Sequence, residues 1–433
     1  MKQNIRKHSA GELAFFSAFD AQKTSFPGLV NNRQSAIAWL QQNGIATKRV
    51  EAYHYSDLRR QFAKSQAYTL DTTTESTAQV SLNDINAHPT IAAFTDLDYE
   101  AIIFVDGSLR LDLSTAKNLQ STAQEKSTWV AENLAREVNE NNVDNLTRAM
   151  WRDGVSLNIV ENTQKPLHLI FVSSGDAATF NRHYIHVAAG VTATIIESHI
   201  NFGDEASFNC HHFNLKLSQG AKLTHFATNG ENHQATNICR TEGDFADDVV
   251  LETTTLAIGG GWVRREGDLY CNGSNMNLKI SGAVLAGGAQ HIDNTFILHH
   301  KLPQNISLQR FKNVVDDKAH AIFQGKVIVS PDAQQTDGQQ MVHTILLSDH
   351  AEISTKPELE IYADDVECAH GATVGALDAD MLFYLRARGI PLKQAQKMLI
   401  HAFIADIAAE MPEALNAAAD QLVTTWLDQH LEV

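Results

Sequence analysis

Cysteine is scarce in this sequence, and no two cysteines stand at short spacing. The four present, Cys210, Cys239, Cys271 and Cys368, are spread singly through 433 residues. A zinc site built from CxxC pairs or a disulfide framework would require closer or more regular spacing. We therefore expect reduced thiols, as in a cytoplasmic protein.

Positive charge and long apolar runs are scarce as well. Lysine and arginine total 34 against 51 aspartates and glutamates, so the formal net charge is -17. Binding to nucleic acid or to anionic membrane surfaces depends on Lys and Arg, so neither is an expected partner. No apolar run approaches the roughly 20 residues of a membrane-spanning helix, and acidic residues interrupt the N-terminal apolar stretch too early for a signal peptide.

Nucleotide-binding motifs are also absent. Gly325 and Lys326 are followed by Val327, where a P-loop requires Ser or Thr, and no glycine stands five positions before Gly325. The glycine run at 259–261 opens no helical pattern, so it does not form a dinucleotide fingerprint. Any nucleotide chemistry must therefore come from a partner.

Sequence periodicity divides the chain into three domains, which we place at 1–155, 156–377 and 378–433. The first is mixed and partly helical, with Ser9 as an expected helix N-cap and a strand expected at 101–105. Further helices are expected near 35–43, 128–138 and 143–151. The third is helical: Asp378 is the expected cap of a short helix that ends at Gly389, and Pro391 begins a longer one.

The middle domain has almost no helical periodicity. Segments 213–218 and 276–281 alternate apolar and polar residues without a break, as strands do. A turn at 187–190 recurs at 217–220, each time before a strand-like run.

Two similar corners at 316–319 and 348–351 complete this weak repeat. Stacked coils of a β-solenoid require such a pattern, whereas a β-sandwich predicts tighter and more regular hairpins. We predict a mainly β protein: a parallel β-helix core, an N-terminal mixed α/β region and a C-terminal helical domain.

Cys368 and His370 belong to the densest group of chemically active residues, 362–373. On a strand these two side chains point to the same side, and a thiolate with an imidazole suits iron or zinc. Two ligands are half of a tetrahedral site. Either the pair is structural, or a neighbouring subunit completes the site.

Asp364 and Asp365, in the same segment, are adjacent and would face opposite ways on a strand. A turn anchor is the expected role, and the acid–base pair of a carbohydrate-active β-helix enzyme is the alternative. The histidines of the middle domain show no closed metal motif, so we expect them to project into solvent or to form ladders. These are His211, His212, His225, His291, His299, His300, His320 and His343. A structural zinc protein is a further alternative.

Residues 356–375, followed by 382–390, closely resemble the C-terminal signature of the SufB/SufD family, which belongs to the SUF machinery for iron–sulfur cluster assembly. Supporting matches occur at 104–107, 165–167, 323–326, 335–338 and 346–348. SufB-like chains tend to have a cysteine where Leu385 stands and to lack the Cys-x-His-Gly-Ala-Thr run, so the SufD branch is favoured.

The resemblance implies a right-handed parallel β-helix and a non-catalytic scaffold role. In the family, SufD forms a heterodimer with its paralogue SufB, and each binds one copy of the ATPase SufC. The isolated chain is expected to hold no cofactor tightly, and it can pair with itself when SufB is absent.

The resemblance also assigns residues. His370, with Cys368 beside it, matches the histidine that faces a SufB cysteine where the nascent cluster is thought to form, so transient iron or a cluster is expected there. The expected SufC-docking segment contains Tyr384, Leu385, Arg386, Arg388 and Gly389. Ala369 replaces a usual Ser between the Cys and the His, which removes one possible hydrogen bond but no ligand.

Overall fold

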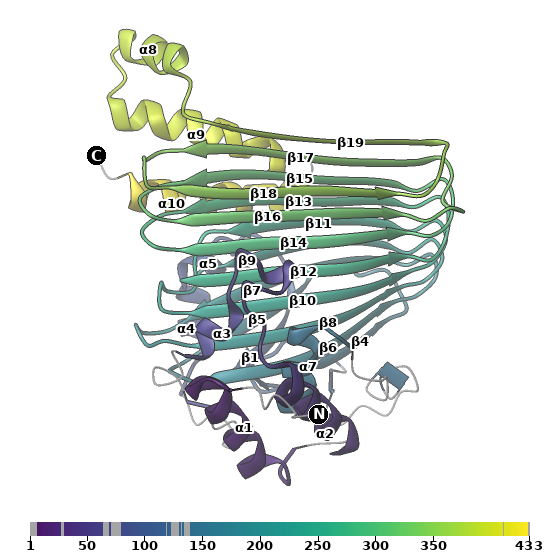
Figure 1. Ribbon diagram of the computed structural model, residues 1–433. Helices are drawn as coiled ribbons and strands as arrows, with labels where there is room; N and C mark the ends of the chain where they lie inside the picture. Colours follow the sequence, from purple (N-terminus) through teal and green to yellow (C-terminus); the bar gives the residue numbers. More distant parts are fainter. Residues whose placement is uncertain are drawn as a thin grey trace.

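The computed structural model forms a tall stack of β-coils with helices at its base, side and top (Figure 1). It describes residues 7–26, 30–63, 69–70, 79–117, 119–122, 130, 132–133, 139–409 and 411–431. In the described part, helices and one 3-10 turn (η1) occur at α1 Ala10–Gln22, α2 Val30–Asn43, η1 Glu51–Tyr53, α3 Leu58–Phe62, α4 Leu82–Ala87, α5 Pro89–Ala92, α7 Asn142–Met150, α8 Ala379–Ala387, α9 Leu392–Ala408 and α10 Glu413–His430.

The strands fall into two sheets. The ten-stranded sheet contains β1 Glu100–Val105, β2 Ser108–Leu109, β5 Leu167–Ser173, β7 Thr192–Asn201, β9 Lys222–Asn229, β11 Val250–Ala257, β13 Asn277–Ala286, β15 Ile306–Val315, β17 Thr336–Leu346 and β19 Val366–Gly375. The nine-stranded sheet contains β3 Gln120–Ser121, β4 Val155–Ile159, β6 Ala178–Val187, β8 Phe208–Leu217, β10 Thr236–Phe245, β12 Trp262–Cys271, β14 His291–His300, β16 His320–Val329 and β18 Glu352–Ile361.

The chain alternates between these sheets, so each coil adds one parallel strand to both. Strand order follows every second strand, from β5 to β19 in one sheet and from β4 to β18 in the other. The predicted repeat is in register: Val187 of β6 pairs with Leu217 of β8. Gly190 and Gly220 occupy stacked turns with positive φ angles of 70° and 67°, where glycine avoids strain. The predicted mainly β solenoid is confirmed, and a sandwich of hairpins is wrong.

Apolar side chains fill the space between the two sheets. Leu157 and Ile185 of the nine-stranded sheet meet Leu169, Ile195 and other side chains of the ten-stranded sheet in one buried cluster. Alternation of side chains along each strand sends these residues inward. Each fully buried Leu or Ile contributes about 1.5–3 kcal/mol relative to exposure, so the stack is held by a continuous core.

Helices α1, α2, α3 and α7 form the base of the stack, against the outer face of β6, β8 and β10. Ser9 caps α1, as predicted, and the structure adds a capping box with Glu12. The strand expected at 101–105 is β1, which pairs with β5 and so belongs to the ten-stranded sheet. Most of the helix expected near 128–138 lies outside the described residues.

Asp144 of α7 anchors this base to the solenoid. Its buried carboxylate lies 2.7 Å from Arg148 Nε, 2.8 Å from Arg182 Nη1 and 3.0 Å from His212 Nδ1. Burial alone would raise the pKa of Asp144, but the Arg182 guanidinium and the His212 imidazole hold that pKa well below its usual range. The helix is therefore fixed by an ionised carboxylate with charged and polar partners.

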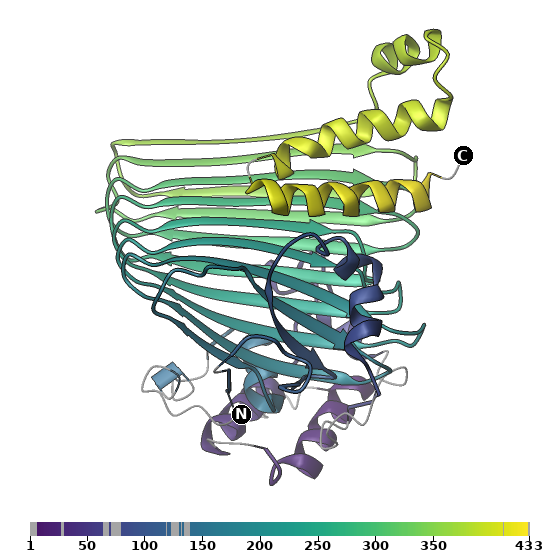
Figure 2. The same ribbon diagram turned by 180° about the vertical axis from the view of Figure 1, so that it is seen from behind.

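Helices α9 and α10 pack side by side on the outer face of the ten-stranded sheet, near its C-terminal end (Figure 2). Lys312 of β15 joins α9 through Phe403 O, at 2.7 Å, and through the Asp406 carboxylate. Helix α8 projects beyond β19 and buries none of its residues (Figure 1). Among the helices that the structure describes, none combines the length and the apolar character needed to cross a membrane.

Candidate functional site

The stack ends at β18 and β19, and each of these strands has one paired edge. In the described residues β18 pairs with β16 and β19 pairs with β17, which leaves their other edges open. Large apolar side chains are exposed nearby: Tyr362 is 64% accessible, and Ile361 and Val374 are also exposed. Open edges with apolar side chains are sites where another chain can add to the sheet.

Cys368 and His370 both lie on β19, at this open end. Cys368 pairs with Gly338 of β17 and is half-buried against the core. Its partial burial raises the pKa of the Cys368 thiol, although a hydrogen bond from the Gly338 N–H opposes the rise and Asp337 adds to it. His370 is exposed on the same strand, two positions away. The expected strand placement is confirmed, and their role as ligands stays a prediction.

Two buried glutamines stand in register behind His370. Gln340 of β17 pairs with His370, and Gln309 of β15 pairs with Gln340, so the three positions share one face of the sheet. Both amides are fully buried, and neither has a hydrogen-bond partner among the described residues. A buried unpaired polar group costs about 1–3 kcal/mol. This polar ladder was not predicted from the sequence, because it depends on the pairing of successive coils.

Asp364 and Asp365 form the turn between β18 and β19, and both are exposed. The Asp365 backbone N–H donates to Gln334 Oε1 at 2.9 Å, and its carbonyl accepts from the Gln335 N–H. The expected turn position is therefore correct, and the backbone of Asp365 makes the anchoring contacts.

Helix α8 presents the expected docking segment. Tyr384, Arg386, Arg388 and Gly389 are exposed and Leu385 is half-buried. The Arg388 guanidinium lies over the Tyr384 ring, 4.6 Å from its centroid. Gly389 ends the helix with a φ of 87°, and Asp378 caps its start, as predicted.

The same helix also exposes large apolar side chains. Phe383 is 74% accessible, and Met381 lies nearby with half of its surface exposed. An exposed helix face of apolar and basic residues suits recognition by another protein.

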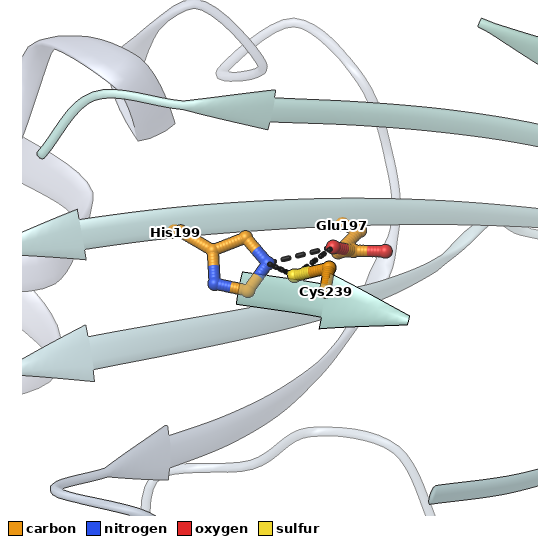
Figure 3. A group of neighbouring side chains, drawn as sticks. All are labelled: Glu197, His199 and Cys239. Atoms are coloured by element: carbon orange, nitrogen blue, oxygen red, sulfur yellow. Dashed lines mark hydrogen bonds and ion pairs between the residues drawn. The ribbon is translucent and has the colours of Figure 1, made fainter. Parts of the chain in front are cut away.

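A second group of chemically active side chains lies inside the solenoid. Glu197 and His199 project from β7, and Cys239 projects from β10 of the opposite sheet (Figure 3). The candidate ligand atoms of these three buried residues all lie within 4.8 Å of one another. His199 Nε2 is 2.6 Å from Glu197 Oε1, and Cys239 Sγ is 3.6 Å from His199 Nε2 and 3.7 Å from Glu197 Oε1.

Charged groups surround this internal cluster. Arg265 Nη2 donates to Glu197 Oε1 at 2.6 Å, and His225 Nε2 lies 3.2 Å from Glu197 Oε2. Burial alone would raise the pKa of Glu197, but Arg265 and the two imidazoles hold it well below its usual range. Burial raises the pKa of the Cys239 thiol well above its usual value. An internal cavity of about 50 Å³ is lined by Glu197, His225 and Arg265 among apolar side chains.

No local sequence pattern indicated this cluster. Cys239 stands 40 residues from His199 and was interpreted as an isolated thiol. The expectation that the histidines project into solvent or form ladders is wrong for His212 and His300, which are fully buried. His211 is buried as well, but its ring stacks on that of His183 in the neighbouring coil, with centroids 5.6 Å apart. It holds for His291, whose ring lies 5.3 Å from that of His320 on the next coil.

Comparison with known proteins identifies the family. Residues 170–403 match the SufBD core domain of SUF system FeS cluster assembly. The chain is 30% identical over 391 residues to the iron–sulfur cluster assembly protein SufD of Escherichia coli, which covers 88% of both chains. It is 30% identical over 416 residues to an iron–sulfur cluster assembly SufBD family protein of Synechocystis, covering 89% of this chain and 88% of that protein.

A chloroplast protein of Arabidopsis thaliana, ABCI7, is 39% identical over 125 residues, which is 28% of this chain and 26% of that protein. The family core covers most of the solenoid and reaches into α9. The chain therefore belongs to the SufB/SufD family of the SUF iron–sulfur cluster assembly system, and the expectation of a SufD member is confirmed.

Proposed function

We propose that this chain is a non-catalytic scaffold that forms a heterodimer with a SufB-type paralogue and helps to assemble an iron–sulfur cluster at their interface. The observation that carries the proposal is the incomplete ligand pair, Cys368 and His370, on the open strand β19. One thiol and one imidazole fill half of a four-ligand sphere. The partner supplies the remainder, including a cysteine.

The open end of the solenoid supports the placement of this partner. Within the part of the chain that the structure describes, strands β18 and β19 present unpaired edges next to the exposed Ile361, Tyr362 and Val374. A paralogue with the same coil geometry can continue both sheets by placing its own end strands antiparallel to β18 and β19. The same edges allow a homodimer when the paralogue is absent.

Helix α8 is the proposed docking site for a SufC-type ATPase. It lies beside the β18–β19 end and leaves Tyr384, Arg386, Arg388 and Gly389 exposed. An ATPase that binds here can transmit its motion to the open end of the solenoid, because α8 follows β19 directly in the chain. The absence of nucleotide motifs fits a division in which the partner supplies ATP hydrolysis.

Iron and sulfide are the cargo of this site and are held transiently. The exposure of His370 and the raised pKa of Cys368 fit a site that becomes a full ligand set when a metal and the partner arrive. All four cysteines are free thiols, which fits the reducing cytoplasm that we propose as the location.

Co-expression with SufB-type and SufC-type chains tests the proposal. We expect a complex whose mass corresponds to one copy of this chain, one SufB-type chain and two SufC-type ATPase chains, one bound to each scaffold chain. After anaerobic addition of iron and sulfide, acid-labile sulfide should be retained by the complex and absent from the isolated chain. A complex that forms without this chain and retains the same amount of sulfide would contradict the scaffold role.

A further inference from the structure

We infer that Glu197, His199 and Cys239 form an internal binding site for one thiophilic divalent metal ion, such as Zn²⁺ or Fe²⁺ (Figure 3). The site lies between β7 and β10, in the interior of the solenoid, whereas Cys368 and His370 lie on the terminal strand β19. It is separate from the proposed cluster site and does not depend on it.

The distances already approach those of a bound metal. A tetrahedral zinc with bonds of about 2.3 Å to sulfur and about 2.0–2.1 Å to nitrogen and oxygen separates its ligand atoms by about 3.4–3.6 Å. Cys239 Sγ stands 3.6 Å from His199 Nε2 and 3.7 Å from Glu197 Oε1. Only the distance between His199 Nε2 and Glu197 Oε1, 2.6 Å, must increase. These two atoms now share the proton of a hydrogen bond, which a bound metal would replace.

The geometry differs from that of a nucleophilic triad. In a Cys–His–acid triad, the imidazole uses one nitrogen for the nucleophile and the other for the acid. Here the Cys239 sulfur and the Glu197 oxygen both approach Nε2 of His199, while Nδ1 has no hydrogen-bond partner in the described residues. Three ligand atoms that converge on one point suit a shared cation better than a proton relay.

A fourth oxygen and a fixed ring complete the arrangement. Asn237 Oδ1 lies 3.2 Å from Cys239 Sγ and can fill a fourth position, which a water molecule can also occupy. The Phe171 ring stacks on the His199 ring, with centroids 4.8 Å apart and an interplanar angle of 18°. This contact holds the imidazole edge toward the cluster before a metal arrives.

Two of the three ligands are anions when a metal is bound. Glu197 is a buried carboxylate and a metal-bound Cys239 is a thiolate, so their two negative charges match those of a divalent ion. Arg265 donates to the same carboxylate at 2.6 Å.

The site departs from the expectation that the isolated chain holds no metal tightly. That expectation considered the cysteines one at a time, and the solenoid brings Cys239 to residues of the opposite sheet. We therefore expect a metal-dependent stabilisation of the isolated chain, because an ion that binds the folded state alone raises its stability.

The test is expression of the full chain with Co²⁺ in the medium, so that the ion is available while the interior folds. We expect about one Co²⁺ per chain by elemental analysis, with the sulfur-to-cobalt charge-transfer absorption of a thiolate ligand. Cys239→Ser should lose this absorption and bind Co²⁺ about tenfold or more weakly. Cys271→Ala changes another buried cysteine of the interior. This variant should retain both the charge-transfer absorption and the affinity for Co²⁺.

Cys368→Ser separates the internal site from β19. We expect this variant to retain the cobalt signal, and the X-ray absorption of its Zn²⁺-loaded form should show a sulfur neighbour near about 2.3 Å. That measurement stands even if Cys239→Ser fails to fold. Absence of bound Co²⁺, absence of a sulfur neighbour, or loss of the signal in Cys368→Ser with retention in Cys239→Ser would overturn the inference.

Discussion

His370 is the residue on which the proposed chemistry of the open end depends most directly. It is exposed on β19, at the open end of the solenoid. We predict that His370→Ala lowers the yield of assembled cluster by about tenfold or more, while the complex still forms. Acid-labile sulfide per complex is the measurement. His350→Ala, at an exposed histidine in the turn before β18, is the matched control, and an equal loss in both variants would remove His370 from the mechanism.

Gln340 stands directly behind His370 and provides a test of the polar ladder. Its buried amide has no partner in the described residues, so Gln340→Leu should raise the free energy of unfolding by about 1–3 kcal/mol. If the ladder serves assembly, the same variant should lower the cluster yield. Urea denaturation and sulfide analysis measure the two effects separately.

Gln324 is a matched control for that substitution. Its amide donates to Thr295 Oγ1 at 3.1 Å and to Ala52 O at 3.4 Å, so Gln324→Leu should destabilise the chain. A stabilised Gln340→Leu variant with unchanged cluster yield would mean that the unpaired amide is without a role in assembly.

Helix α8 carries the proposed ATPase contact at the scale of a single element. We predict that Arg386→Glu lowers the amount of SufC-type ATPase that co-purifies by about tenfold, because it places a negative charge on an exposed docking face. Arg49→Glu makes the same change at an exposed position shortly before η1, and the ATPase should co-purify normally with this variant. A normal ATPase ratio with Arg386→Glu would contradict the docking assignment.

The elements of this chain were predictable wherever local signals coincide. Ser9 with Glu12 and Asp378 with Gly389 are cap residues that define helix ends within a few positions. The repeat that joins 187–190 to 217–220 indicated stacked coils, and the i, i+2 spacing of Cys368 and His370 placed both on one strand.

Contacts between coils were not predictable in the same way. Thr236 pairs with Trp262, whereas His320 pairs with Glu352, so the length of a coil changes along the stack. A sequence repeat of variable length cannot specify which side chains meet across the interior. The Gln309–Gln340 ladder and the approach of Cys239 to His199 depend on that register, and both were missed.

At the scale of the whole molecule, buried histidines couple stability to pH. Burial lowers the pKa of His168 and His183 to about 3 and that of His300 to about 4. In the unfolded chain these three imidazoles bind protons below about pH 6.5. In the folded chain the same imidazoles stay neutral until about pH 4. The unfolded state therefore gains stability as the pH falls through this window, and each unit of pKa shift is worth about 1.4 kcal/mol.

We accordingly predict that the free energy of unfolding, measured with urea, decreases from about pH 6.5 to about pH 4. His168→Gln should reduce the slope, since His168 is fully buried against Phe94 and Tyr99 and hydrogen-bonds Ser198. His350→Gln, at an exposed position, should leave it unchanged. A stability that is flat over this range would show that the buried imidazoles are protonated in the folded state.

The central claim is that this chain supplies part of a cluster-binding site and a partner at the β18–β19 end supplies the rest. Acid-labile sulfide is the most direct measurement, because the internal metal site requires no sulfide. After anaerobic reconstitution, the account predicts sulfide retained by the complex with the SufB-type and SufC-type chains, and none retained by the isolated chain. A stable iron–sulfur cluster on the isolated chain would contradict it.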